Sequence, residues 1–128
     1  MAILGLGTDI VEIVRMEKAL KKMGNKFAQR ILTAEEFVEF MQNKQPARFL
    51  AKHFAAKEAT AKAIGTGIAC GISFHDFSIE HDHLGKPVLA INHRALEILS
   101  QRNFTHSFLS ISDESSYAIA TVLLESNN

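Results

Sequence analysis

Cysteine and net charge are both nearly absent from this chain of 128 residues. Cys70 is the only cysteine, which excludes an internal disulfide and a cysteine-rich zinc site and fits a reducing compartment. The 14 basic residues balance the 14 acidic ones, so the formal net charge is zero. A neutral chain does not favour nucleic acid as its main partner, although a local basic surface can still bind an acidic protein.

Long apolar runs are missing as well, since none reaches the ~18 residues that a membrane span needs. The first residues, MAILGLGTD, carry no basic segment and end in an acid, so we expect no signal peptide. The composition, 47% apolar and 22% charged, is ordinary for a globular protein. The length favours one domain over residues 1–128. We expect a cytoplasmic protein with no membrane partner.

The hydrophobic pattern predicts helices in the first half of the chain and mainly strands in the second. We expect a buried strand over Ala2–Thr8, helices over Ile10–Met23, Phe27–Leu32, Thr33–Met41, Pro46–Ile64 and Asn92–Gln101, and strands over Ser73–His81, Pro87–Asn92, Phe104–Asp113 and Ser116–Leu124. Pro46 at the first helical position and Gly65 just past the end bound the long central helix. This order predicts an α+β fold with an antiparallel sheet packed on that helix.

Glu58 is an unusual residue in the central helix, because on a helical wheel it falls within the apolar arc of Leu50, Phe54 and Ala51. An unpaired ionised carboxylate there is costly, so it needs a cation, a proton or an opening in the fold. Lys62 follows at i+4, and an ordinary Glu58–Lys62 ion pair is worth ~0.2–0.5 kcal/mol. The wheel alone favours that pair over a metal-binding or catalytic role.

Asp9 is a second acid in apolar surroundings, between ILGLGT and IV. With Glu12 three residues later, its spacing fits a helix N-cap with a reciprocal glutamate, and spacing alone favours that interpretation. The alternative is a functional acid. Gly5 and Gly7 just before it indicate either a close backbone approach or a turn.

A metal site would join these two acids. Mg²⁺ commonly takes one or two protein carboxylates, with water and substrate phosphate oxygens completing its shell. A neighbouring lysine neutralises phosphate charge. Asp9, Glu58 and Lys62 therefore form a candidate phosphoryl-transfer site, provided that the fold brings Asp9 and Glu58 together.

Four segments carry a resemblance: GLGTDIVEIVR, RFLAKHFAAKEATAKAIGTGI, LGKPVL and SISDESSYAIATVLLE. In this order, and over nearly the full length, the chain resembles the holo-[acyl-carrier-protein] synthases, which are small phosphopantetheinyl transferases of bacterial fatty-acid synthesis. The resemblance implies an enzyme that moves the 4′-phosphopantetheine arm of coenzyme A to a serine of apo-acyl carrier protein, releasing adenosine 3′,5′-bisphosphate. It also implies a trimer with coenzyme A bound between subunits.

The resemblance places Mg²⁺ between Asp9 and Glu58. Lys62 matches the second lysine of the long motif and would stabilise or protonate the leaving bisphosphate. Attack by a hydroxyl on a diphosphate depends mainly on positioning and charge neutralisation. Whether a metal-bound water or Glu58 accepts the serine proton stays open.

The coenzyme A contacts implied by the resemblance lie in two turns. Gly65, Thr66 and Gly67 follow a helix rather than opening one, so they are not a P-loop; they would permit close approach of the ligand. A plain helix cap and turn is an equal alternative. Lys86 and Pro87 match a loop near the nucleotide, and a solvated turn lysine is again an equal alternative.

Basic residues crowd the first helical region: Arg15, Lys18, Lys21, Lys22, Lys26 and Arg30. Such a run is by default a solvated face. The resemblance instead implies docking of the acidic acyl carrier protein, with Arg15, Lys22 and Arg30 as contacts. Met16, Met23 and Phe27 are either apolar anchors between these charges or core residues.

Asp113 departs from the family, in which many members carry a histidine after the SIS run. A turn residue is the favoured interpretation and a third acidic role the alternative. The His81-Asp82-His83 group is not expected to bind zinc. Rival functions are a non-catalytic coenzyme A or nucleotide-binding module on the same scaffold, and a protein-interaction domain. The joint presence of Asp9, Glu58 and Lys62 favours the enzyme.

Overall fold

The computed structural model describes residues 1–127. Its helices and strands follow the order that the sequence predicts, except that Phe74–Asp76 is a 3₁₀ helix within the strand expected over Ser73–His81. The elements are β1 (Ala2–Glu12), α1 (Ile13–Met23), α2 (Asn25–Ile31), α3 (Ala34–Gln42), α4 (Pro46–Ile64), the 3₁₀ helix η1 (Phe74–Asp76), β2 (Phe77–His81), β3 (Pro87–Ile91), α5 (His93–Ser100), β4 (Phe104–Asp113) and β5 (Tyr117–Ser126). The predicted α+β class is confirmed. No helix in this described part of the chain is long and apolar enough to cross a membrane.

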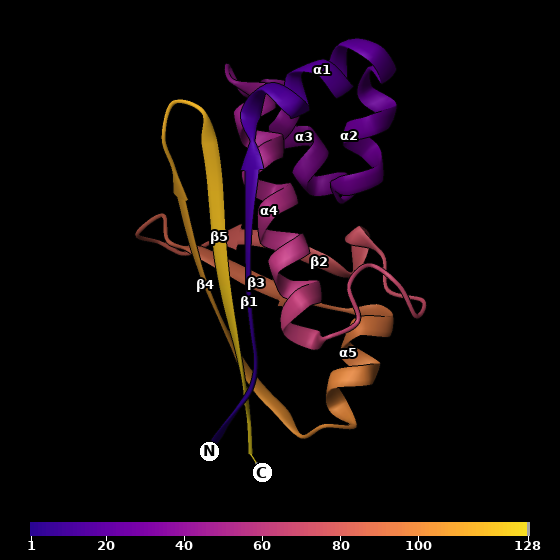
Figure 1. Cartoon of the computed structure of the whole chain (residues 1–128), viewed down its shortest axis with the longest axis vertical. Helices are drawn as coiled ribbons and strands as arrows, with labels where there is room; N and C mark the ends of the chain where they lie inside the picture. Colours follow the sequence, from indigo (N-terminus) through magenta and orange to yellow (C-terminus); the bar gives the residue numbers. More distant parts are fainter. Residues whose placement is uncertain (128) are drawn as a thin grey trace.

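Two antiparallel sheets flank the central helix. One has the strand order β1-β5-β4, and the other is the β2–β3 hairpin. Figure 1 shows α4 lying along the three-stranded sheet, with α1, α2 and α3 gathered at one end of the molecule and α5 toward the other. The two chain ends lie close together, because β1 and β5 are antiparallel partners that start and finish there.

The bounds of α4 agree with the sequence prediction. Pro46 occupies the first turn, where its missing N–H is not needed. Gly65 ends the helix in the left-handed conformation at φ 96°, and its N–H bonds to the carbonyl oxygen of Ala61. Local chemistry at each end therefore fixes the length of this helix.

The glycines of β1 let α4 approach the sheet closely. A Cβ on Gly5 would overlap the backbone carbonyl of Ala63, and one on Gly7 would overlap that of Ala59. Of the two interpretations offered by the sequence, close backbone approach is the one observed and a turn is not. The alanines of α4 complete the contact because they add little bulk.

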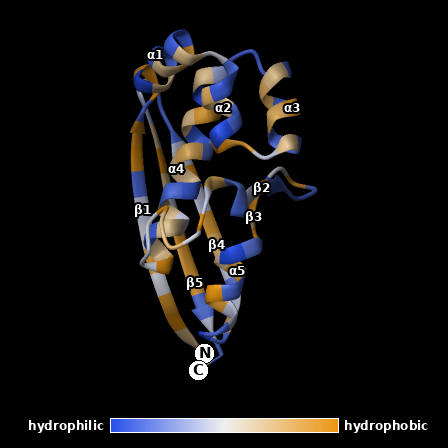
Figure 2. Cartoon of the chain, turned by 90° about the vertical axis from the view of Figure 1, so that its right-hand side faces the viewer, coloured by the Kyte–Doolittle hydropathy of each residue, from blue (hydrophilic) through white to orange (hydrophobic). Residues whose placement is uncertain are grey.

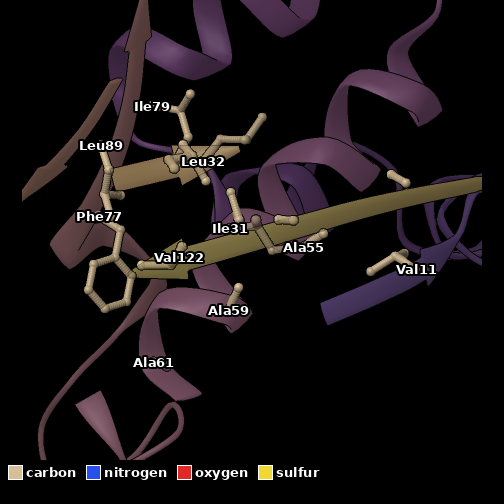
Figure 3. Close-up of a cluster of buried hydrophobic side chains, with 14 of the residues drawn as sticks. Val11, Ile31, Leu32, Ala55, Ala59, Ala61, Phe77, Ile79, Leu89 and Val122 are labelled. Atoms are coloured by element: carbon tan, nitrogen blue, oxygen red, sulfur yellow. The ribbon is translucent and has the colours of Figure 1, made fainter. Parts of the chain in front are cut away.

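The hydrophobic core lies between α4 and both sheets. Figure 3 shows buried side chains from β1, α4, β5, β2 and β3 converging on one another, among them Val11, Ala55, Val122, Phe77 and Leu89. In the three-stranded sheet, alternate residues of β5 face this core. The intervening residues leave an apolar outer face, and hydrophobic stretches run along these strands in Figure 2.

Two predictions near the N-terminus are wrong. The strand β1 continues to Glu12, and α1 begins only at Ile13, so Asp9 lies inside a strand and is not a helix cap. β1 is also not buried on both faces, since Leu6 and Ile10 are exposed. The reason is tertiary: β1 pairs with β5 as far as Glu12 opposite Tyr117, and this ladder outweighs the local capping signal.

Candidate active site

Asp9 and Lys62 meet across the β1–α4 contact. Lys62 Nζ lies 2.9 Å from Asp9 Oδ1 and donates a second bond of 3.0 Å to the carbonyl oxygen of Thr8. The side chain of Asp9 is 16% exposed and that of Lys62 is 52% exposed, so the pair opens to solvent on the lysine side. The ordinary Glu58–Lys62 pair favoured by the wheel is therefore wrong, because β1 offers Lys62 an acid from outside its own helix.

Glu58 lies close enough to this pair to be influenced by it. Partial burial raises the pKa of the Glu58 carboxyl, and the negative charge of Asp9 raises it further, while Lys62 and Arg15 act in the opposite direction. The fold thus brings together two carboxylates that are far apart in the sequence, with two cations beside them. The sequence predicts a phosphoryl-transfer site only if the fold brings Asp9 and Glu58 together, and here both residues lie in one region with Lys62.

Arg15 reaches the same place from α1. Its guanidinium carbon lies 5.7 Å from the ring centroid of Phe54, which is one turn before Glu58 on α4. Phe54 packs in turn on Phe74, with 5.5 Å between ring centroids. Through Arg15, the basic part of α1 therefore extends to the neighbourhood of Asp9 and Glu58. Lys22 and Arg30 are exposed in the last turns of α1 and α2.

The Gly65-Thr66-Gly67 turn follows directly after Lys62. The N–H of Gly67 bonds to the Ala61 carbonyl at 3.2 Å, and Arg102 Nη1 donates to the Ile64 carbonyl at 2.6 Å. These bonds hold the end of α4 and make the turn a true helix cap. Gly67 has φ 66°, a conformation that glycine adopts without strain.

Lys86 and Pro87 lie at the other side of the sheet. Lys86 belongs to the β2–β3 hairpin turn, in which Asp82 Oδ1 accepts hydrogen bonds from the N–H groups of Leu84 and Lys86, and Pro87 is the first residue of β3. β3 packs beside β4, and Figure 1 shows the turn projecting past that edge. Asp9 is on β1, the opposite edge strand, so one chain alone does not bring Lys86 to the acidic pair.

Asp113 ends β4 and holds the start of α4. It accepts a bond of 2.8 Å from Arg48 Nη1 and lies 3.7 Å from Lys52 Nζ. Arg48 also donates to the carbonyls of Glu114 and Ser115. Arg48 precedes Glu58 by ten residues of α4, about 15 Å along the helix. Asp113 is therefore not brought to the Asp9–Glu58 pair.

The sequence interpretation missed a buried polar group on the far side of α4. Lys57 is fully buried and bonds to Glu36. His53 lies beside them, with its Nε2 atom 3.9 Å from Glu36 Oε2. A signal was available, because Lys57 follows Leu50 by seven residues and so lies on the same apolar face.

The donor set at Asp9 and Glu58 limits what this site can hold. In residues 1–127, no group of three or more His, Cys, Asp or Glu side chains is arranged to bind a metal ion. A cation here would have two protein carboxylates and take its other ligands from water or substrate. That ligand set is common for Mg²⁺ and unusual for Zn²⁺.

Comparison with known proteins gives the class of protein to which this fold and site correspond. A family model for the 4′-phosphopantetheinyl transferase superfamily matches residues 5–122. The chain belongs to this superfamily, as the sequence resemblance predicts.

Individual relatives within this superfamily are similar to the chain over nearly its full length. The chain is 59% identical to the holo-[acyl-carrier-protein] synthase of Vibrio parahaemolyticus over 126 residues, which cover 98% of this chain and 100% of that protein. The crystal structure of the synthase from Neisseria meningitidis aligns with a TM-score of 0.90 at 47% identity, covering 97% of this chain and 99% of that one. A Helicobacter pylori synthase in complex with coenzyme A aligns at 0.81 and 33% identity, covering 94% and 99%.

Proposed function

We propose that this protein transfers the 4′-phosphopantetheine arm of coenzyme A to a serine of apo-acyl carrier protein and releases adenosine 3′,5′-bisphosphate. The observation that carries this proposal is the meeting of Asp9, Glu58 and Lys62 at the β1–α4 contact. The relatives are named for this reaction, and one solved relative is a complex with coenzyme A. The setting would be bacterial fatty-acid synthesis in the cytoplasm.

The pair of acids fits a divalent cation. The raised pKa of Glu58 reflects the cost of a partly buried carboxylate that faces a second one. A cation bound by Asp9 and Glu58 would relieve that repulsion, and Mg²⁺ suits two carboxylates with open positions for water and phosphate. When bound, Mg²⁺ would neutralise the diphosphate of coenzyme A and polarise the phosphorus under attack.

Lys62 would act on the leaving group. Its ammonium is held by Asp9 and the Thr8 carbonyl but is half exposed, so it retains donor capacity toward the solvent side. There it would stabilise or protonate the leaving bisphosphate. The adjacent turn of Gly65, Thr66 and Gly67 carries no bulky side chain at its glycines, which supports close approach of coenzyme A.

The carrier protein would dock on the basic region of α1 and α2. Arg15 lies both on this region and beside Glu58, so an acidic carrier held there would present its serine to the acids. Lys22 and Arg30 extend the positive surface. Complementary charge mainly speeds and orients the encounter between two proteins.

We further propose a homotrimer in which further copies cover the outer face of the three-stranded sheet. In the register of the sheet Leu6 lies opposite Leu123, which in turn lies opposite Phe108, and Ile10 lies opposite Ile119. Leu6 is 65% exposed and Phe108 is 50% exposed. A contiguous exposed apolar patch is typical of an interface.

A ring of copies would also complete the coenzyme A site. Lys86 and Pro87 lie beyond the β4 side, whereas Asp9 lies on β1. Head-to-tail contacts that close into a ring would bring the hairpin of one copy to the acids of the next. The single domain predicted over residues 1–128 stays a prediction, and its last residue lies outside the described part.

Mass spectrometry tests the proposed reaction. Apo-acyl carrier protein is incubated with coenzyme A and Mg²⁺, with and without the enzyme, and we expect a mass gain of one phosphopantetheine arm only with the enzyme. Removing Mg²⁺ with a chelator should stop the gain. Binding of coenzyme A without any mass gain would instead favour the non-catalytic module.

A further inference from the structure

A buried ion pair stands behind the candidate active site and takes no part in the proposed chemistry. Lys57 is fully buried, and its ammonium donates to Glu36 Oε1 at 2.6 Å and to the Ile31 carbonyl at 2.7 Å. Glu36 is 3% exposed. The two charges are therefore paired and hydrogen-bonded away from water.

Glu36 connects four elements of the fold. Its Oε1 atom also accepts the N–H of Thr33 at 2.9 Å, which is the capping box of α3. Its Oε2 atom accepts the N–H of Ile79 in β2 at 2.7 Å. Through Lys57, this carboxylate ties the end of α2, the start of α3 and strand β2 to one point on α4.

The electrostatics of the pair agree with this geometry. Burial alone would raise the pKa of Glu36, but Lys57 and the N–H donors of Ile79 and Thr33 lower it overall. Burial lowers the pKa of Lys57, and Glu36 opposes that shift. Each charge depends on the other, so the pair behaves as a unit.

Lys57 immediately precedes Glu58 on α4, and this adjacency links the pair to the site. Successive helical residues point about 100° apart around the axis. Lys57 bonds to α2 and α3, while Glu58 lies close enough to Asp9 and Arg15 for their charges to act on it. Rotation of α4 about its axis would therefore displace both side chains together.

On the β1 side of α4, the contacts near Glu58 are less directional. The contacts with β1 at Gly5 and Gly7 set how closely the helix approaches, but glycines present no side chain that resists rotation. Lys62 bonds to Asp9 through a long side chain that is half exposed. Near Glu58, the short buried bonds of Lys57 therefore constrain the rotation of the helix more directionally than these contacts do, whereas Arg48, bonded to Asp113, holds the start of α4 ten residues earlier.

We propose that Glu36 and Lys57 are a positioning pair that fixes the rotation of α4 and so holds Glu58 opposite Asp9. This inference rests on the proposed function and adds residues that touch neither substrate nor metal. Stability alone explains the pair poorly, because replacing a buried ion pair with apolar groups is often neutral or stabilising. Directional bonds to four elements explain it better, because they specify one orientation.

The test uses the full-length double variant Glu36→Gln/Lys57→Met, which removes both charges and keeps side-chain size. We expect the affinity for Mn²⁺, measured by electron paramagnetic resonance with adenosine 3′,5′-bisphosphate present, to fall by about 10–100-fold. We expect kcat to fall by a similar factor while KM for the carrier protein stays within about twofold. In a crystal structure of the metal-free variant, Lys62 Nζ should lie beyond hydrogen-bond distance of the Asp9 carboxylate.

Leu99→Ala is the matched control, since Leu99 is fully buried in α5 and its truncation lowers stability without touching the pair. This variant should lose thermal stability but keep the Mn²⁺ affinity of the wild type. Equal losses of affinity in both variants would show that the pair only stabilises the fold, and an unchanged Lys62–Asp9 hydrogen bond in the double variant would overturn the proposal.

Two further outcomes are distinguishable. If the double variant does not fold, Glu36→Asp keeps both charges and shortens the acid by one methylene, and we expect a smaller loss of affinity at nearly unchanged KM for the carrier; wild-type affinity there would overturn the proposal. If the wild type itself binds no Mn²⁺, the proposed metal role fails, while the crystal structures still decide whether the pair positions α4.

Discussion

Glu36, which bonds to α4, and Glu58, which belongs to α4, show what separates a structural acid from one proposed to bind a metal ion. Glu36 is almost fully buried, pairs with Lys57 and accepts two backbone N–H groups, and its pKa is lowered. Glu58 is partly exposed, faces the like charge of Asp9, and its pKa is raised. The first acid has every partner it needs within the chain. The second has Lys62 and Arg15 nearby, yet its pKa stays raised, so a bound divalent cation would relieve the remaining repulsion.

The largest effect should come from neutralising Glu58, the acid whose pKa is raised. Glu58→Gln removes the charge that would hold Mg²⁺, so we expect phosphopantetheine transfer to be lost. Because the raised pKa means that the charged form of Glu58 costs stability in the folded protein at neutral pH, the variant should melt at or above the wild-type temperature. Transfer is measured by carrier mass and stability by thermal unfolding. Retained turnover would remove the metal role.

Breaking the buried Glu36–Lys57 ion pair should instead lower the stability of the fold. Lys57→Met leaves Glu36 buried without its cation, and we expect a loss of about 3–5 kcal/mol in the free energy of unfolding. Urea denaturation measures it, with Lys62→Met as the exposed counterpart that should lose less than ~1 kcal/mol. Similar losses in the two variants would mean that the buried Lys57 contributes no more to folding stability than the exposed Lys62.

The folding stability should also depend on pH, because His53 is buried beside Glu36. Burial lowers the pKa of His53 to about 4, against the nearby Glu36, and its Nε2 atom is buried without a hydrogen-bond partner. The pKa of His53 is near 6.5 in the unfolded chain and about 4 in the folded protein. Between these two pH values the unfolded chain therefore binds more protons than the folded protein does. Stability should therefore fall as the pH falls from about 6.5 to 4, by up to ~3 kcal/mol.

Lys57 and His81 also oppose the charging of His53. A His53→Gln variant should show a flatter stability curve over the same pH range, because glutamine does not titrate. Equal slopes for variant and wild type in urea unfolding would assign the pH dependence to other groups.

The smallest expected effect is on binding of the carrier protein by Arg15. Arg15→Glu should raise KM for the carrier protein by about tenfold, equivalent to ~1.4 kcal/mol, and reduce its dependence on salt. Lys44→Glu changes the net charge equally before α4 and serves as the control. An unchanged KM in Arg15→Glu would exclude Arg15 from the docking surface.

Much of the fold could be predicted because its signals are local. Pro46 and Gly65 mark the ends of α4, and the reciprocal bonds of Thr33 and Glu36 start α3, within three residues of each other. The strand Phe104–Asp113 likewise has the predicted bounds. Here each residue acts on its immediate neighbours, so the sequence pattern contains the whole interaction.

The errors arose where the deciding partner is distant in the chain. Asp9 has the spacing of a helix cap, but pairing of β1 with β5 keeps it in a strand. Lys62 has the spacing to pair with Glu58, but β1 brings Asp9 to it across 53 residues. Lys57 bonds to Glu36 across 21 residues, a partner that no helical spacing indicates.

The sequence by itself determined the lengths of α3 and α4 and the order of helices and strands, and it identified Asp9, Glu58 and Lys62 as candidates for a phosphoryl-transfer site. Only the tertiary structure decided that Asp9 bonds to Lys62 near Glu58 and that Lys57 bonds to Glu36. The physical reason is that caps and turns depend on neighbours along the chain. The surroundings of a charge depend instead on which elements pack against it, and here the glycines of β1 and the carboxylate of Glu36 set those surroundings.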